Sequence, residues 1–257
     1  MTTQTESGDR SAARPTLHQK YVQRIEDLCR TDPGARTALR KGLRRGLDDV
    51  ARTGGMHRLI TPWMPRGPET AENEQRAYFT IAALIAAQPR YSFAAPESQD
   101  AVGEKGDGVS APAPAADTGT TTVVTPAEQA ATHRRSGGSL GSAFAHAVVQ
   151  SPGREREMRL STAESRLNLL TRQSVNGLHR HLPSSVGYLR DLDVPVDWAR
   201  LLGDLIGWQT RSGRISRRWL QDFYWLCAQA DRDNSAGADR QEAAAEEAAE
   251  GAAATPQ

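Results

Sequence analysis

Basic side chains recur at helical spacing early in the chain. Five of them fall in the stretch RTALRKGLRR, where residues four apart would form two neighbouring columns on a helix: Arg36, Arg40, Arg44, Lys41 and Arg45. Like charges four residues apart destabilise an isolated helix. A ridge of five cations without interleaved acids therefore favours an external anion as its partner. The alternative is a solvated face whose acids come from another helix.

A second basic cluster, RSGRISRRW, precedes and opens the last predicted helix. Its cations lie at a helix start, where they oppose the macrodipole, and the candidates for binding are Arg214, Arg217 and Arg218. That local cost indicates either a phosphate partner or an acid supplied by the tertiary fold. Trp219 fits the apolar face of the same helix, so we predict a core position for it rather than a base-stacking role.

A third group contains Arg166, Arg172 and Arg180 together with His179. Arg172 and His179 are seven residues apart and share one face if the helix between them is unbroken. A binding surface and an ordinary solvated face both stay open for this group.

Signals for catalysis are weak. His179 and His181 are two residues apart, which on a helix places their imidazoles on different faces, so we predict no metal site. The glycines around Ser139 neither follow a strand nor precede Lys-Ser/Thr, as a phosphate-binding loop requires. The other histidines have no evident acid or nucleophile partner. We predict a protein that is not an enzyme and needs no cofactor.

The elements that must position these residues all have the helical period. Apolar residues recur at helical spacing in eight segments, covering 17–30, 33–47, 71–87, 140–148, 160–181, 183–192, 198–208 and 214–229. Asp32 and Pro33 fit a helix start, as do Ser139 and Asp197. Alternating strand patterns are absent from the sequence. The expected fold class is all-α, a helical bundle in two packed halves with a disordered insertion and disordered termini.

Charge is unevenly placed along the chain. The formal net charge of the 257 residues is only +1. The tail 231–257 has seven acids and two arginines, the stretch 94–132 has six acids and one lysine, and the first 15 residues balance. The rest of the chain therefore carries +11, a charge that attracts polyanions. Of its 32 basic residues only three are lysines; arginine suits phosphate recognition, although genome base composition explains such a ratio equally well.

These patterns divide the chain into five parts. We predict a disordered N-terminus at 1–15, an N-terminal helical half at 16–93, a flexible insertion at 94–132, a C-terminal helical bundle at 133–230 and an acidic Ala/Glu tail at 231–257. The tail is either a solvated helical extension or disordered. The sequence contains no signal peptide pattern and no membrane-length apolar run, which predicts a cytoplasmic protein without membrane contact.

An ordered series of segments resembles the CasB family, the small subunit of the type I-E CRISPR Cascade surveillance complex. The segments are RTALRKGL, MHRLITPWMP, NEQRAYFTIAALIA, GGSLGSAFAHAV, ESRLNLLTRQSVNGLHRHLP, VDWARLLGDLIGWQ and ISRRWLQDFYWL. They cover nearly all of the chain outside the termini and the insertion. The insertion and the acidic tail depart from the family pattern.

The resemblance implies two packed helical bundles without enzyme activity, placed in a ribonucleoprotein beside the large subunit and the backbone subunits. It further implies two copies stacked head to tail, with basic surfaces that support the crRNA–DNA heteroduplex and the displaced single-stranded DNA. Most of the arginines named above, with Lys41, lie in matching segments, whereas Arg45 and Arg180 are added from charge alone. The alternative function is a helical adaptor whose basic faces bind acidic proteins. For a hydrolase or nuclease, the sequence shows no set of candidate catalytic residues.

Overall fold

The computed structural model describes residues 15–65, 72–93, 138–149 and 156–253. Every regular element in these ranges is helical, and no strand is found in them, which confirms the all-α prediction. The predicted insertion at 94–132 and the N-terminal segment 1–14 lie outside the described residues. The five-part division of the chain stays a prediction.

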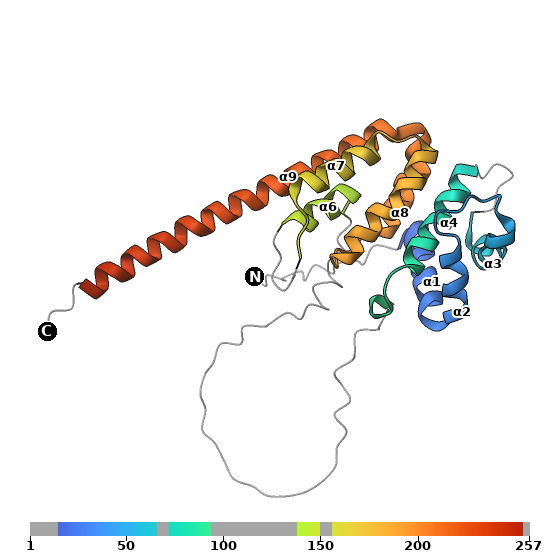
Figure 1. Ribbon diagram of the computed structural model, residues 1–257, viewed down its shortest axis with the longest axis horizontal. Helices are drawn as coiled ribbons and strands as arrows, with labels where there is room; N and C mark the ends of the chain where they lie inside the picture. Colours follow the sequence, from blue (N-terminus) through green and yellow to red (C-terminus); the bar gives the residue numbers. More distant parts are fainter. Residues whose placement is uncertain (1–14, 66–71, 94–137, 150–155, 254–257) are drawn as a thin grey trace, which may run out of the picture.

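The first four long helices gather at one end of the molecule (Figure 1). They are α1 (Leu17–Thr31), α2 (Pro33–Lys41), α3 (Val50–Ile60) and α4 (Glu72–Ala86). Two short 3₁₀ turns, η1 (Thr61–Trp63) and η2 (Arg90–Phe93), follow α3 and α4. The Asp32 side chain accepts a hydrogen bond from the Ala35 backbone and Pro33 occupies the first turn of α2, as the sequence predicted.

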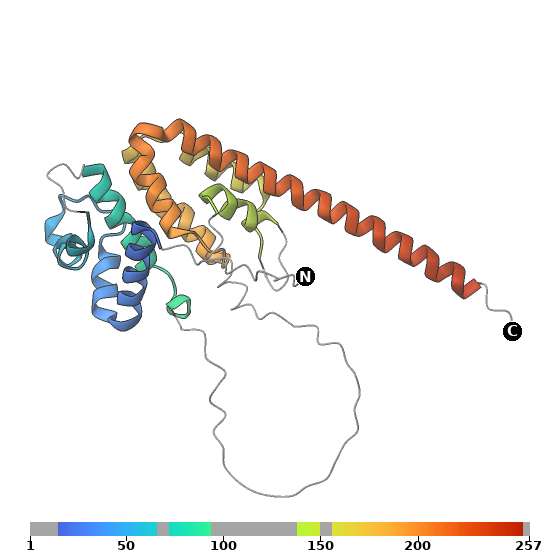
Figure 2. The ribbon, with the colours of Figure 1, turned by 180° about the vertical axis from the view of Figure 1, so that it is seen from behind.

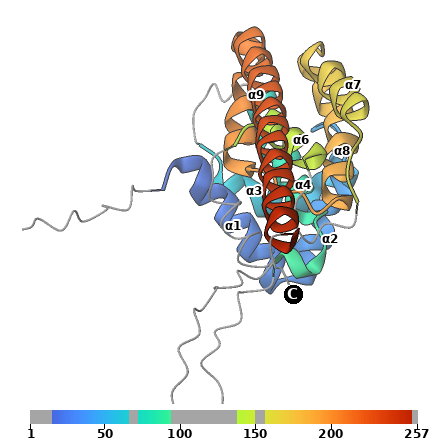
Figure 3. The ribbon, with the colours of Figure 1, turned by 90° about the vertical axis from the view of Figure 1, so that its left-hand side faces the viewer.

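The remaining helices are α6 (Leu140–Val148), α7 (Leu160–Thr171), α8 (Val175–Asp191) and α9 (Trp198–Ala253). The α9 helix packs against α6, α4 and α1. Figure 3 shows α7 and α8 on one side of it and α1 on the other. Buried apolar residues from both sets of helices form one continuous core, in which Trp208, Trp219 and Phe223 of α9 are fully buried. Trp219 thus has the predicted core position.

Three predicted helix boundaries are wrong. The segment 33–47 ends as a helix at Lys41, because the chain turns at Gly42 and Arg44 has a positive φ of 63°. The segment 160–181 divides into α7 and α8, because the Ser174 side chain caps a new helix by accepting a hydrogen bond from the Gly177 backbone. Pro183 lies inside α8 rather than at the start of a further helix.

The last two predicted helices join into α9 across a kink at Arg211, whose φ of −134° and ψ of 19° are not helical. Beyond the body α9 continues through Ala253 and projects past the other described helices (Figures 1 and 2). Of the two states that the sequence left open for the acidic tail, the structure therefore has the helical extension rather than a disordered terminus. The high helix propensity of alanine and glutamate accounts for it.

Candidate nucleic-acid interface

Arg36 is held inside the fold rather than displayed on a ridge. Its Nε donates to the Ala86 carbonyl at 3.1 Å and its Nη2 donates to the Gln88 carbonyl at 2.5 Å. The guanidinium also lies 5.4 Å from the centre of the Phe93 ring. Arg36 thus satisfies carbonyls at the C-terminal end of α4, where a cation is favoured by the helix dipole.

The predicted column of Arg36, Arg40 and Arg44 does not form. Met56 of α3 packs so closely on Gly42 that a Cβ there would lie 1.9 Å from the Met56 sulfur. The chain leaves the helical path after Lys41, and Arg44 has a positive φ of 63°. Arg40 and Lys41 stay exposed on the last turn of α2, whereas Arg44 and Arg45 lie in the turn that follows.

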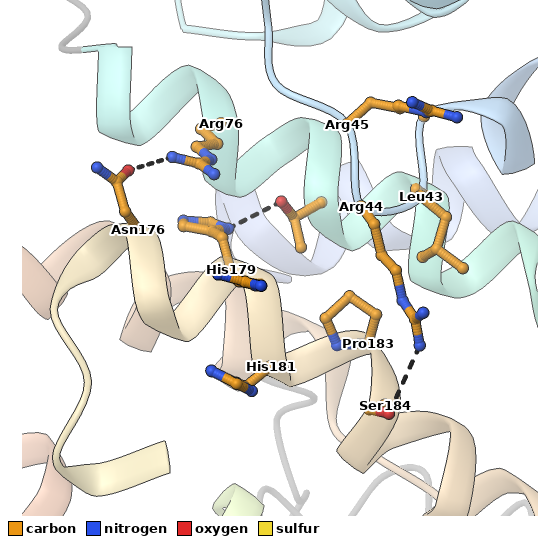
Figure 4. Close-up of a pocket in the computed structure, with 13 residues that line it drawn as sticks. Leu43, Arg44, Arg45, Arg76, Asn176, His179, His181, Pro183 and Ser184 are labelled. Atoms are coloured by element: carbon orange, nitrogen blue, oxygen red, sulfur yellow. Dashed lines mark hydrogen bonds between the residues drawn. The ribbon is translucent and has the colours of Figure 1, made fainter. Parts of the chain in front are cut away.

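The turn after α2 faces α8 across a cavity of about 570 Å³. The cavity is lined by residues of the α2–α3 turn, of α4 and of α8 (Figure 4). No carboxylate lines it, and its charged or titratable side chains are Arg44, Arg45, Arg76, Arg180, His179 and His181. Three predicted binding residues, Arg44, Arg45 and Arg180, are thus brought together from positions far apart in the sequence.

Polar contacts cross this cavity at both ends. Arg44 Nη2 lies 3.5 Å from Ser184 Oγ at one end, and Arg76 donates to the Asn176 side chain at the other (Figure 4). Arg45 makes a loose ion pair with Asp49, with Nη1 and Oδ2 at 3.8 Å. Because both partners are partly exposed, that pair contributes less than about 1 kcal/mol and leaves Arg45 largely unneutralised.

His179 lies between these contacts and is 4% exposed. Its Nδ1 is 2.9 Å from the Thr80 hydroxyl oxygen of α4. Burial, with a smaller contribution from the charge of Arg76, lowers the pKa of His179 to about 4. The imidazole is therefore neutral at pH 7. Arg172 and His179 would share one face only on an unbroken helix, and the break between α7 and α8 excludes this.

Arg76 and Thr80 were missed by the sequence analysis. A signal was present, since they lie four residues apart on α4, where the residues that follow are almost all apolar. Two polar side chains on one face of an otherwise buried helix indicate a polar environment opposite that face.

The second basic cluster divides between the core and the surface. Arg218 donates to Asp204, whose other oxygen accepts from Trp219 Nε1 at 2.7 Å. Asp204 is 5% exposed. Of the two partners that the sequence allowed for this cluster, Arg218 therefore has the acidic side chain supplied by the fold. Arg214 and Arg217 are exposed, and no salt bridge to either is found in the described part of the chain.

The third group is dispersed. The Arg166 guanidinium of α7 lies 4.5 Å from the centre of the Tyr188 ring of α8. This contact joins the two helices. Arg172 is exposed at the end of α7, and Arg180 is exposed at the cavity. The roles of these arginines in binding stay a prediction. What the structure adds is that Arg36, Arg166 and Arg218 already have partners within the chain.

Among the described residues, no cluster of His, Cys, Asp and Glu has the arrangement of a metal site. None of the described helices is long and apolar enough to span a membrane.

The model of the family described as CRISPR-associated protein Cse2 matches residues 35–224, well over half of the chain. The chain belongs to the Cse2 family. Cse2 is also called CasB, so the resemblance predicted from the sequence is confirmed, and the chain is a small subunit of type I-E Cascade. No curated protein matches the chain.

Solved structures agree with the Cse2 assignment. A chain of a "CRISPR RNA-guided surveillance complex" is 28% identical with a TM-score of 0.61, over 85% of this chain and 97% of that one. A second such complex, described as pre-nicking, is 29% identical with a TM-score of 0.62 over the same shares. CasB from Thermus thermophilus shares the fold at 16% identity and a TM-score of 0.51, covering 82% of this chain and 99% of that one.

Proposed function

We propose that this Cse2 family chain binds the nucleic-acid backbone within the surveillance complex and thereby stabilises the R-loop. The ligands are the crRNA–DNA heteroduplex and the displaced single-stranded DNA. One observation carries the proposal: the cavity between the α2–α3 turn and α8 gathers four arginines and no carboxylate. Like charges brought together by folding repel one another unless an anion lies between them.

Contacts of this kind suit a subunit that must bind any target. Arginine to phosphate hydrogen bonds position a strand without reading its sequence. R-loop formation exchanges one duplex for another of similar stability, so a few backbone contacts decide whether the loop persists. In this proposal the guide RNA reads the sequence, and the chain has a structural role without catalysing a reaction.

Protein contacts in the complex are proposed to lie elsewhere on the surface. Tyr224 and Trp225 of α9 are 47% and 61% exposed, and they line an apolar depression with Leu220. Exposed aromatic residues are enriched at protein interfaces. This depression supports contacts with the large subunit, the backbone subunits or a second copy stacked head to tail. An exposed apolar depression also suits a protein-interaction adaptor, the second candidate function, whose predicted basic faces would bind acidic partners elsewhere on the surface.

The lifetime of the R-loop in the reconstituted complex tests the proposal. The double variant Arg44→Ala and Arg180→Ala removes two cations of the cavity. We expect the R-loop to dissociate about tenfold faster or more, and the salt dependence of binding to fall by about one unit per lost phosphate contact.

The matched control is Arg232→Ala with Arg240→Ala, which removes two exposed cations from the helical extension of α9. We expect the control to keep the R-loop lifetime of the unchanged chain. Equal lifetimes for both double variants would contradict the proposal. If the complex also gave no crosslinks between nucleic acid and this chain, the adaptor would replace it.

A further inference from the structure

The cavity beside α8 has a volume typical of ligand sites. Its volume of about 570 Å³ lies within the range of pockets that take small molecules or single nucleotides. Its walls come from α4, the α2–α3 turn and α8, with Arg76 and Asn176 closing one end. A group held there would contact parts of the chain that are more than a hundred residues apart in sequence.

His179 supplies an unsatisfied hydrogen-bonding atom in this wall. The residue is buried, and its Nε2 has no hydrogen-bond partner among the described residues. A buried polar atom without a partner costs about 1–3 kcal/mol. A ligand that supplies the partner removes this cost when it binds.

The other ring nitrogen decides what kind of atom is missing. The Thr80 hydroxyl makes its only hydrogen bond in the described part of the chain with His179 Nδ1, at 2.9 Å. Which atom donates in this bond depends on the tautomer of the ring. The ring is neutral at pH 7 because burial lowers the pKa of His179. In the tautomer whose Nδ1 accepts from the Thr80 hydroxyl, the single proton is on Nε2, which is then a donor.

Every charged side chain that lines the cavity is also a donor, because arginine has no acceptor atom. In this tautomer no arginine can satisfy His179 Nε2. Its partner would be an acceptor, and four neighbouring arginines favour one that is negatively charged.

We infer that the cavity binds one phosphate group of a nucleic-acid strand, with His179 donating a hydrogen bond to it from Nε2. This inference rests on the proposed function, which supplies the phosphate. Arg44 and Arg180 are exposed and line the cavity from the α2–α3 turn and from α8. The 3.5 Å contact from Arg44 to Ser184 is long for a hydrogen bond, so Arg44 exchanges it for the phosphate at little cost.

Histidine NMR on the full chain tests the inference. The chain has only six histidines, and comparison with the His179→Gln variant assigns the His179 signals in a long-range ¹H–¹⁵N spectrum. We expect the free chain at pH 7 to have the proton of His179 on Nε2. Adding a short oligothymidylate at low salt should shift this Nε2 signal with the same midpoint as binding measured by fluorescence anisotropy.

Two controls isolate the phosphate. His57 also has a ring Nε2 without a partner among the described residues, but it lies against Phe79 and does not line the cavity. Its signal should not move. An oligothymidylate with uncharged methylphosphonate linkages keeps the bases and removes the charge, and it should leave His179 unshifted.

The possible failures separate the two proposals. If the oligothymidylate binds while His179 stays unshifted, the phosphate site is wrong and the proposed function stands. If the oligothymidylate does not bind at low salt, both are wrong. A shift produced by polyglutamate but not by the oligothymidylate would assign the cavity to an acidic protein partner and would overturn the inference.

Discussion

Arg36, Arg166 and Arg218 have the same charge as Arg40 and Arg180, yet the fold engages each of the first three within the chain. Arg36 binds carbonyls at the end of α4, Arg166 stacks on Tyr188 and Arg218 pairs with Asp204. Arg40 and Arg180 are exposed. Substituting the first set changes stability as well as binding, so exposed arginines are the cleaner tests of nucleic-acid contact.

Asp204 gives a prediction for stability at the residue scale. It is buried and accepts from both Arg218 and Trp219. Asp204→Ala leaves two donors without a partner, and we expect it to lower the free energy of unfolding by about 2–4 kcal/mol in urea denaturation. Asp27→Ala removes an exposed pair with Arg30 and should cost less than about 1 kcal/mol. Equal losses in the free energy of unfolding for the two variants would show that the buried hydrogen bonds of Asp204 contribute no more to stability than the exposed ion pair of Asp27.

The protonation of His179 makes stability depend on pH. Its pKa is about 4 in the folded chain and 6.5 when unperturbed. The unfolded chain therefore binds this proton first, and stability falls as pH is lowered below 6.5. We expect a loss of about 2 kcal/mol between pH 7 and pH 5 from this group. We expect His179→Gln to lose about 2 kcal/mol less of its free energy of unfolding between pH 7 and pH 5 than the unchanged chain does, as measured by urea denaturation at both pH values.

At the scale of elements, glycines decide how closely helices approach. Gly141 of α6 lies against the backbone of α9, where a Cβ would be 1.8 Å from the Trp219 carbonyl oxygen. Gly42, the C-cap of α2, lies against the end of the Met56 side chain, where a Cβ would be 1.9 Å from the sulfur. Arg44 follows two residues later and lines the cavity.

A pair of glycine variants tests this packing. Gly141→Ala should lower the free energy of unfolding by about 3 kcal/mol or more, because the backbone of α9 must move to admit the methyl group. Gly54→Ala in α3 meets nothing within 4 Å and should stabilise the chain by up to about 1 kcal/mol. Thermal unfolding followed by circular dichroism distinguishes them. A neutral Gly141→Ala would contradict the close approach of α6 and α9.

At the scale of the whole molecule, charge is separated between the body and the extension of α9. Residues 231–257 carry seven acids and two arginines in a chain of net charge +1. The extension projects from the body, and its described side chains are almost all exposed (Figure 2). It therefore lowers the overall attraction for polyanions without neutralising the cavity by direct contact.

Removing the extension should strengthen binding by the free chain. Truncation after Ala230 changes the net charge from +1 to +6. We expect affinity for a single strand to rise by roughly three- to tenfold at low ionic strength and the difference to fade in high salt. Replacing the seven acids by glutamine keeps the length and should have the same effect. Fluorescence anisotropy across a salt series measures both, and an unchanged affinity for both would contradict this role of the charge.

The helical content, most helix starts and the family could be predicted from the amino-acid sequence alone. These follow from local chemistry, since Asp32, Ser139 and Asp197 cap helices through backbone groups three residues away, as predicted. The ordered apolar segments also carried the resemblance to CasB.

Only the tertiary structure decided which arginines have partners and where the cavity forms. Asp204 meets Arg218 across the kink of α9, and His179 meets Thr80 from 99 residues away. Helical periodicity relates residues within one turn or two, whereas these contacts depend on how separate helices pack. For Arg76 the spacing with Thr80 on α4 indicated a polar face, but only the packing of α4 against α8 shows that Asn176 and His179 lie opposite that face.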